Sequence, residues 1–234
     1  METVASSFGC GNPVALAGIS QGETVLDLGC GAGLDLLIAA RLTGPSGKVI
    51  GVDMTPAMVE RARSAAARLG FTHVEVREGV IESLPVSSSS VDLVISNCVL
   101  NLSPEKHRVF KEIARVLRAG GRFSVSDIVV EDMPSALKED MALYSACVAG
   151  AVSEREYVEG LRRAGLVDVE VRERHEYSRS EIMAMIGTSE EDGCCGTTAV
   201  RSRAERERIA DLLAGRVASI RVVGRKPAGA VPVE

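Results

Sequence analysis

The sequence predicts an α/β fold, in which a doubly wound, mostly parallel sheet of seven strands carries helices on both faces and a small C-terminal extension. Segments typical of strands and of helices alternate from residue 24 to about residue 130. The largely apolar segment 91–97 is typical of a strand that is buried on both faces. A glycine-rich loop at 29–33 separates the first strand-like segment from the first helix-like one, as in Rossmann-like folds. Together these observations predict a ligand site at the carboxyl ends of the parallel strands.

Local signals give the order of the elements in the first 130 residues. Thr55 is a typical N-cap with Pro56 in the first helical turn, and Gly70 ends that helix. Gly120 and its neighbour turn the chain into the fifth strand. Asp127, near the end of that strand, is expected to cap a turn, with a place in the ligand site as the alternative. Strands are expected at 24–28, 48–53, 74–78, 91–97 and 122–128, and helices at 34–42, 56–69 and 103–117.

After residue 130 the regular alternation stops. Ser153 and Glu156 form a capping-box pattern at a helix start. Helices are expected at 136–149, 153–164, 180–186 and 199–214, strands at 167–172 and 217–225, and a polar loop at 187–198. The predicted organisation is an N-terminal lid segment (1–20), a Rossmann-like cofactor-binding core (21–130), a substrate-side part with a cysteine-bearing loop (131–225) and a disordered tail (226–234).

Composition disfavours several classes of function. Of the 234 residues, 46% are hydrophobic, which suffices for a full core, whereas only 3% are aromatic. The net charge of −5 argues against a nucleic-acid-binding surface. No apolar run approaches the ~20 residues that span a bilayer, and the first residues are not the basic start of a secretory signal. We therefore expect a cytoplasmic protein with no nucleic-acid or membrane partner.

The glycine loop predicts a cofactor that contains a nucleoside. Gly29, Gly31 and Gly33 let the backbone turn tightly and approach a ligand closely. Asp53 follows twenty residues after the last of them, where such folds place a carboxylate on a ribose. The position at which the dinucleotide pattern requires its third glycine is a leucine. With Asp27 in front, the loop reads D-x-G-x-G-x-G and resembles that of class I S-adenosylmethionine (SAM) methyltransferases; an NAD domain or a purely structural turn is the alternative.

The six cysteines are the next signal. Cys98 follows the fourth strand and Cys147 follows the fifth, so both are expected at the carboxyl edge of the sheet. Cys10 lies in a glycine-bearing segment that can fold over this edge, whereas Cys30 is expected to pack under the glycine loop or to line the cofactor pocket. A thiolate site for a soft ion and a set of spectator thiols are both compatible with this spacing. A zinc site is disfavoured because the sequence has no C-x-x-C pair.

Five segments, 7–17, 51–55, 95–103, 126–128 and 147–151, resemble the arsenite SAM methyltransferase family. The resemblance extends from about residue 7 to residue 166, and the segments 9–13 and 97–103 are specific to that family. It implies that Cys98 and Cys147 bind As(III), with Cys10 as the third catalytic thiol.

The resemblance also implies that SAM is the cofactor. The residues expected to contact it are Phe8, Asp27, Gly29, Cys30, Gly31, Gly33, Asp53, Met54, Ile81, Glu82, Asn97, Val99 and Leu102.

The activity that the resemblance implies is transfer of a methyl group from SAM to thiol-bound trivalent arsenic, in arsenic detoxification. The substrate is arsenite or methylarsenite, free or as a thiol conjugate, and antimonite stays open as a related substrate. As(III) is soft and suits thiolate ligands, and its lone pair attacks the methyl group without a general base. The family mechanism adds reduction of the product by protein thiols, for which Cys10 and Cys98 are the candidate pair. A thiol reductant such as glutathione or thioredoxin then reopens their disulfide.

Two departures from the family leave alternatives open. The chain begins almost at segment 9–13, where family members carry a longer N-terminus with further cysteines, so activity is expected to be weak, or to stop after one methyl, if that part is needed. The pair Cys194 and Cys195 is either an arsenic-capture site, as in some relatives, or an exposed loop with reactive thiols.

The competing functions are a class I methyltransferase of an organic small molecule, which the low aromatic content disfavours, and a non-catalytic As(III)-binding protein.

Overall fold

The computed structural model describes residues 17–138, 140, 143, 147–186 and 202–229. The strands are β1 (Thr24–Leu28), β2 (Lys48–Asp53), β3 (Val74–Glu78), β4 (Val91–Asn97), β5 (Leu117–Val130), β6 (Val167–Glu176) and β7 (Val217–Arg225). The helices are α1 (Leu34–Thr43), α2 (Pro56–Arg68), α3 (Lys106–Val116), α5 (Glu154–Arg163), α6 (Arg179–Met185) and α7 (Arg203–Leu213), with 3-10 turns η1 (Leu100–Leu102) and η2 (Ser135–Leu137). None of the helices in the described ranges is long and apolar enough to cross a membrane.

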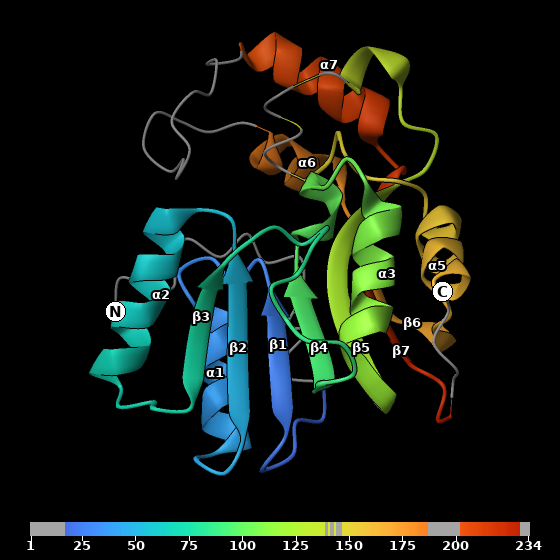
Figure 1. Ribbon diagram of the computed structural model, residues 1–234. Helices are drawn as coiled ribbons and strands as arrows, with labels where there is room; N and C mark the ends of the chain where they lie inside the picture. The colour runs from blue at the N-terminus through green and yellow to red at the C-terminus, as the bar shows by residue number, and fades with distance from the viewer. Residues whose placement is uncertain (1–16, 139, 141–142, 144–146, 187–201, 230–234) are drawn as a thin grey trace.

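All seven strands form one sheet in the order β3-β2-β1-β4-β5-β7-β6, which confirms the predicted doubly wound α/β fold (Figure 1). The five strands from β3 to β5 are parallel to one another, whereas β7 runs antiparallel to β5 and β6. The strand order reverses between β1 and β4. In open α/β sheets such a reversal creates the crevice in which ligands bind, at the carboxyl ends of the strands.

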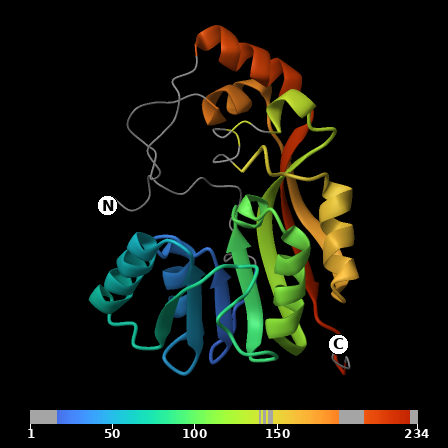
Figure 2. The same ribbon diagram turned by 45° about the horizontal axis from the view of Figure 1, so that its top comes forward.

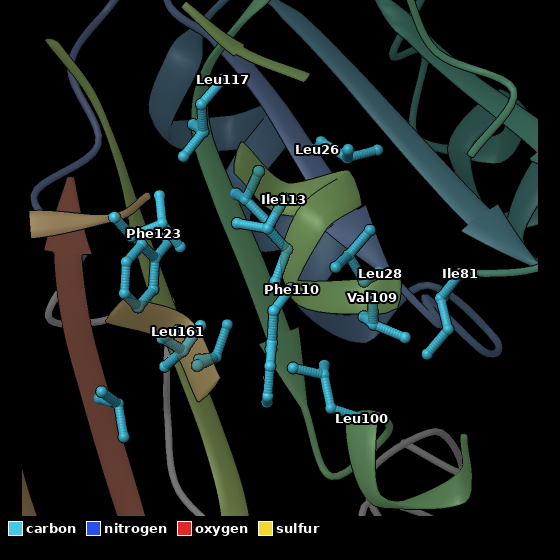
Figure 3. Packing of buried hydrophobic residues seen from close by; sticks show 14 of the residues in the cluster. Leu26, Leu28, Ile81, Leu100, Val109, Phe110, Ile113, Leu117, Phe123 and Leu161 are labelled. Atoms are coloured by element: carbon cyan, nitrogen blue, oxygen red, sulfur yellow. The ribbon is translucent and has the colours of Figure 1, made fainter. Parts of the chain in front are cut away.

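Two hydrophobic clusters cover the two faces of the sheet. Successive residues of β1 point to opposite faces: Val25 packs in a cluster with α1 and α2, whereas Leu26 packs in a cluster with α3 and α5. Figure 3 shows part of the second cluster, in which Phe110 and Leu161 extend from the two helices toward the strands. The rings of Phe110 and Tyr157 meet edge to face at 5.3 Å between centroids, which joins α3 to α5.

A third cluster lies at the carboxyl ends of β4 and β5. The helices α6 and α7 lie side by side above this edge in both views (Figure 1, Figure 2). The cluster includes Ile128 and Val130 of β5, Ile182 of α6, Ile209 and Leu213 of α7, and both Cys98 and Cys147. The two cysteines therefore lie at the boundary between the sheet and the helices that cover its carboxyl edge.

Two strands are longer than the sequence predicts. β5 begins at Leu117 rather than at residue 122, because Leu117 pairs with Val91 and the strand continues through Gly120 with a shift of register. β6 continues to Glu176, since its second half pairs with β7. In both cases the extra residues are held by a partner strand that local sequence signals do not identify.

Two further expectations need correction. Within the helix expected at 136–149, the described residues show the end of η2, a helical Leu143 and a turn that starts at Cys147, so the helix ends earlier than expected. Lys226, which the sequence assigns to a disordered tail, exchanges main-chain hydrogen bonds with Gly120 (3.1 Å) and Gly121 (2.8 Å).

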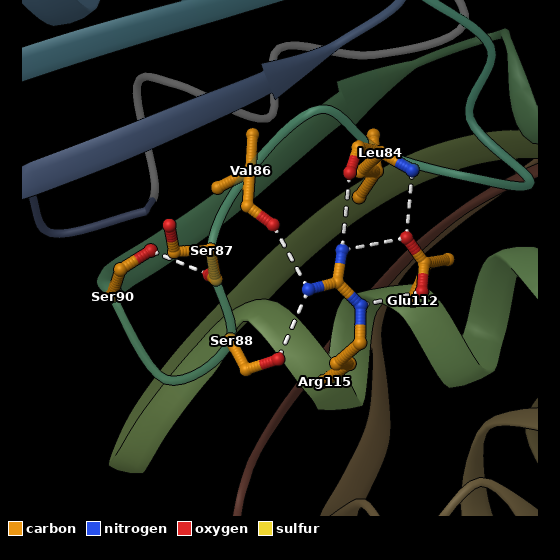
Figure 4. A network of polar contacts seen from close by, with 7 residues as sticks. All are labelled: Leu84, Val86, Ser87, Ser88, Ser90, Glu112 and Arg115. Atoms are coloured by element: carbon orange, nitrogen blue, oxygen red, sulfur yellow. Dashed lines mark hydrogen bonds and ion pairs between the residues drawn. The ribbon is translucent and has the colours of Figure 1, made fainter.

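A polar network fixes the loop between β3 and β4 onto α3 (Figure 4). The guanidinium of Arg115 donates hydrogen bonds to the carbonyl oxygens of Leu84 (3.1 Å) and Val86 (2.9 Å). Glu112 binds the same guanidinium and accepts a hydrogen bond from the amide of Leu84 at 2.7 Å. The loop also carries Ile81 and Glu82, so this network helps to place two of the residues predicted to contact the cofactor.

Candidate functional site

The glycine loop joins β1 to α1 at the carboxyl edge of the sheet. Gly29, Gly31 and Gly33 have φ values of +63°, +50° and +96°, which glycine adopts without strain. A Cβ atom at Gly29 would lie 2.4 Å from Cγ2 of Val99, so only glycine allows this close approach. The loop therefore rests directly on the segment that carries Cys98.

Asp53, at the end of β2, holds the same loop. Its Oδ2 accepts a hydrogen bond from the amide of Gly31 and its Oδ1 one from the amide of Thr55, each at 2.9 Å. Asp27 in β1 is buried, and its Oδ2 has no hydrogen-bond partner within the described part of the chain. Burial raises the pKa of Asp27 well above its ordinary value, and the charges of Asp35 and Asp53 raise it further.

Asp35, in the first turn of α1, is a site residue that the sequence analysis missed. Its Oδ2 accepts a 3.1 Å hydrogen bond from Nδ2 of Asn97, which ties α1 to the end of β4. Burial raises the pKa of Asp35, and the hydrogen bond from Asn97 opposes this shift. The only local signal was an acidic residue two positions after the last glycine of the loop, and such residues are common in the first turn of a helix.

These groups fit a cationic cofactor better than an anionic one. Asp27, Asp35 and Asp53 gather around the glycine loop, and Asp27 has a buried oxygen without a partner among the described residues. Positive charge beside such carboxylates favours their ionised form, whereas the negative charge of a pyrophosphate would be repelled. SAM has a sulfonium and an ammonium group and no phosphate, and Asp53 stands where a ribose is bound in such folds. The residues present therefore fit SAM.

Cys98 and Cys147 lie together beyond the ends of β4 and β5. The thiol of Cys147 donates a hydrogen bond to the carbonyl oxygen of Cys98, with an S–O distance of 2.9 Å, and both residues are buried. Their φ values are +55° and +60°, a conformation that is rare outside glycine and clusters at functional sites. Cys98 is disulfide-bonded, whereas Cys30 and Cys147 are free thiols, so the partner of Cys98 is not among the described residues.

A buried polar group adjoins Cys147. Burial raises the pKa of Cys147 to about 12; the charge of Asp127 raises it further and that of Lys106 lowers it. Burial also raises the pKa of Asp127 to about 7, against the hydrogen bonds that it accepts from the amide of Ile128 and the hydroxyl of Tyr157. Cys147 is therefore a neutral thiol in the absence of a ligand, and a bound soft ion has to displace its proton.

The other predicted cofactor residues are placed differently. Ile81 is buried, and the carboxylate of Glu82 accepts a hydrogen bond from the hydroxyl of Ser103. Met54 and Leu102 are 71% and 39% exposed, which leaves their side chains accessible to a ligand.

Cys30 packs beneath the loop, as one of the two sequence interpretations expects. A Cβ atom at Gly51 would lie 2.8 Å from its sulfur. Within the described part of the chain, no three His, Cys, Asp or Glu side chains are grouped as metal ligands. Phe8, Cys10, Cys194 and Cys195 lie outside the described residues.

The strand order, the glycine loop and the acid at the end of β2 define a Rossmann-like domain of the class I methyltransferase type. Comparison with known families agrees: the chain belongs to the methyltransferase domain family, whose model matches residues 19–165.

Among curated proteins, the chain is similar to arsenite methyltransferases. It is 49% identical over 170 residues to that of Halobacterium salinarum, covering 72% of this chain and 44% of the relative. It is 38% identical over 175 residues to that of Aquipseudomonas alcaligenes, covering 71% and 50%. The chain thus spans half or less of the length of these relatives. The resemblance to the arsenite SAM methyltransferase family is confirmed.

A solved structure leads to the same family. CrArsM, an arsenic(III) S-adenosylmethionine methyltransferase from Chlamydomonas reinhardtii, superposes with a TM-score of 0.76 at 35% identity. The match covers 97% of this chain and 70% of that one.

Proposed function

We propose that this chain binds SAM and transfers its methyl group to trivalent arsenic held by cysteine thiolates, with arsenite or methylarsenite as the substrate. The observation that carries the proposal is the position of Cys98. Asn97, before it, donates a hydrogen bond to Asp35 in the first turn of α1. Val99, after it, packs against Gly29 of the glycine loop. A metalloid bound by Cys98 is therefore next to the cofactor loop.

Cys147 is the second proposed ligand. It comes from a different part of the chain, and its thiol is hydrogen-bonded to the main chain of Cys98 at 2.9 Å. Soft ions such as As(III) prefer sulfur ligands, and Cys10 is the third proposed thiol. The similarity to arsenite methyltransferases supports this choice of substrate over an organic one.

Each part of the site has a distinct task. Asp53 would hold the ribose hydroxyls, and the carboxylates of Asp27 and Asp35 would favour a cofactor that carries positive charge. When bound, SAM supplies an electrophilic methyl group on a sulfonium. Sulfur ligands leave a lone pair on trivalent arsenic, so no side chain has to remove a proton from the nucleophile. The main contribution of the protein is to hold the substrate in place, which is worth up to about 7–11 kcal/mol.

The proposed cycle needs a reductant. Cys98 is disulfide-bonded in this structure and has to be reduced before it binds arsenic. A thiolate of glutathione or thioredoxin attacks the disulfide, a mixed disulfide forms, and a second thiol releases Cys98, so that two electrons pass to the protein. Such reductants keep thiols reduced in the cytoplasm, where we place the protein.

The test is a methylation assay with purified protein, SAM, glutathione and arsenite, followed by chromatography with elemental mass detection of arsenic species. The wild-type protein should form methylated arsenic, and Cys98→Ser should form none. Because serine only replaces the sulfur with an oxygen, SAM affinity measured by calorimetry should stay within about twofold of wild type, a difference of less than 0.5 kcal/mol.

The other outcomes separate the alternatives. If neither arsenite nor methylarsenite is methylated, although the protein binds both arsenite and SAM, a non-catalytic arsenic-binding protein is indicated. If arsenite is not bound at all, the proposal is wrong and an organic acceptor should be sought.

A further inference from the structure

Asn101 connects three segments of the candidate site. It lies in η1, three residues after Cys98, and is completely buried. Its Nδ2 donates hydrogen bonds to the carbonyl oxygens of Ile128 (2.6 Å) and Cys147 (3.4 Å). Because both partners are carbonyl oxygens, only the amide nitrogen can face them. One side chain thus joins the turn after β4, the end of β5 and the segment that carries Cys147.

The main chain of Asn101 is itself fixed. Nζ of Lys106 donates a 3.2 Å hydrogen bond to its carbonyl oxygen, and its amide donates to the carboxylate of Asp127. Lys106 also binds the carbonyl oxygen of Ser103 at 3.0 Å, so it clamps the start of α3 to η1. The main chain of Asn101 is therefore held in place, so its side chain can hold the segment that carries Cys147.

The segment held by Asn101 needs such support. Cys147 has a φ of +60°, and a residue other than glycine keeps that conformation only where its surroundings hold it. Its carbonyl oxygen accepts a hydrogen bond from Asn101, and its thiol donates one to the carbonyl oxygen of Cys98. The first contact orients the backbone, and the second shows where the thiol is directed as a result.

We infer that Asn101 is a positioning residue that holds the thiol of Cys147 beside Cys98 and thereby sets the spacing of the two sulfur ligands. The inference rests on the proposed function, because it assigns this spacing to metalloid binding. Asn101 does not touch the reacting atoms. Without its amide, the carbonyl oxygens of Ile128 and Cys147 lose a donor inside the protein, and the Cys147 segment is released from β5.

The test uses the variants Asn101→Leu, which removes the donors at similar size, and Asn101→Ser, which leaves room for a water molecule and serves if the leucine variant does not fold. The matched control is Thr43→Val, which deletes a buried hydrogen bond from a side chain to the carbonyl oxygen of Ala40 (3.2 Å) at the far end of α1.

Arsenite binding to reduced protein is measured by equilibrium dialysis with elemental mass detection. The rate at which iodoacetamide alkylates Cys147 and Cys30 is measured in parallel by peptide mass spectrometry.

Both Asn101 variants should weaken arsenite binding by about tenfold, as expected for one lost hydrogen bond of ordinary strength. Cys147 should be alkylated faster while Cys30 is not, and SAM affinity should be unchanged. In turnover, the KM for arsenite should rise more than kcat falls. Thr43→Val should match wild type in each of these measurements, although it is less stable to heat.

Arsenite affinity equal to wild type in the Asn101 variants overturns the inference and leaves the proposed function standing. If the wild-type protein itself does not bind arsenite, the proposed function fails instead. The alkylation rates then decide the positioning role: faster alkylation of Cys147 alone supports it, and unchanged rates overturn it.

Discussion

The hydroxyl of Tyr157 donates a 3.3 Å hydrogen bond to Oδ2 of Asp127, and both side chains are buried. This contact joins α5 to β5 beneath the edge of the sheet where Cys147 lies. Burial raises the pKa of Tyr157 well above its ordinary value, and the charge of Asp127 adds to the shift. Tyr157 therefore stays protonated at neutral pH and remains a donor to Asp127.

The first prediction concerns the pH dependence of stability at Asp127. Burial raises the pKa of this carboxyl to about 7, with Lys106 and Tyr157 as the opposing groups that face it. Because the folded state binds this proton more tightly than the unfolded state, the group stabilises the fold fully below the unfolded pKa of 3.8. That stability is lost as the pH rises through the folded pKa.

Asp127→Asn removes this titration. The variant should therefore become more stable relative to wild type as the pH rises from about 4 to about 8, because only wild type loses stability over this range. Each unit of pKa shift corresponds to about 1.4 kcal/mol, so the trend amounts to a few kcal/mol. Urea titrations across this range measure it, and a difference that does not vary with pH would show that Asp127 titrates normally.

The second prediction is that Asp53→Asn weakens SAM binding. In wild type, the two carboxylate oxygens of Asp53 accept hydrogen bonds from the amides of Gly31 and Thr55, each at 2.9 Å. Asparagine keeps the shape of the side chain but loses its charge and one of the two acceptor oxygens. Hydrogen bonds to charged groups contribute about 1.5–3 kcal/mol, which corresponds to roughly a tenfold to hundredfold loss of SAM affinity. Calorimetric titration with SAM measures the effect. Asp168→Asn is the control, because Asp168 is an exposed carboxylate paired with Arg225, and a similar loss in both variants would contradict a specific role for Asp53.

The third prediction is that Gly29→Ala destabilises the fold through a clash and not through φ alone. The new Cβ would lie 2.4 Å from Cγ2 of Val99, whereas a Cβ at Gly44, which has a similar φ of +67°, would meet nothing within 4 Å. Gly44→Ala therefore measures the backbone strain by itself. Gly29→Ala should lose about 1–3 kcal/mol more than this control, the usual range for overpacking. Adding Val99→Ala should restore part of the loss; if it restores nothing, the clash is not the cause.

Local signals predicted the elements around the site better than the contacts within it. The bounds of β1, β2, β3, β4 and β7 agree with expectation, because apolar runs, caps and glycines mark them in the sequence. The rule that ligands bind at the carboxyl ends of strands was enough to place Cys98. The contact between Asn97 and Asp35, in contrast, joins residues 62 positions apart, and no local pattern encodes such a pair.

Asp127 shows the same limit. Its short polar side chain near the end of a strand suggests a turn cap, and it does accept from the amide of Ile128, but its other donors are Tyr157, thirty residues further on, and the amide of Asn101. β5 was placed too late for a related reason, since Leu117 becomes part of the strand only by pairing with Val91. Tertiary pairing, and not propensity, decides such positions.

The last prediction concerns the loop that carries Ile81 and Glu82. Arg115 binds the loop carbonyl oxygens of Leu84 and Val86 and, at the same time, both carboxylate oxygens of Glu112. Lysine has one nitrogen and cannot reproduce this planar set of contacts. Arg115→Lys should therefore lower the free energy of unfolding by about 1–2 kcal/mol, a value reduced because the guanidinium is one-third exposed.

The loop itself should respond most strongly. Amide hydrogen exchange of residues 80–88 should accelerate in Arg115→Lys while exchange in β1 and β2 is unchanged, because the loop opens locally once its anchor is weakened. The control is Arg155→Lys, which alters an ion pair between Arg155 and Glu159 whose arginine is 87% exposed and should change neither stability nor exchange. SAM affinity should fall in parallel with the exchange of this loop. Faster exchange with unaltered SAM affinity would mean that Ile81 and Glu82 do not contact the cofactor, and would remove both from the proposed site.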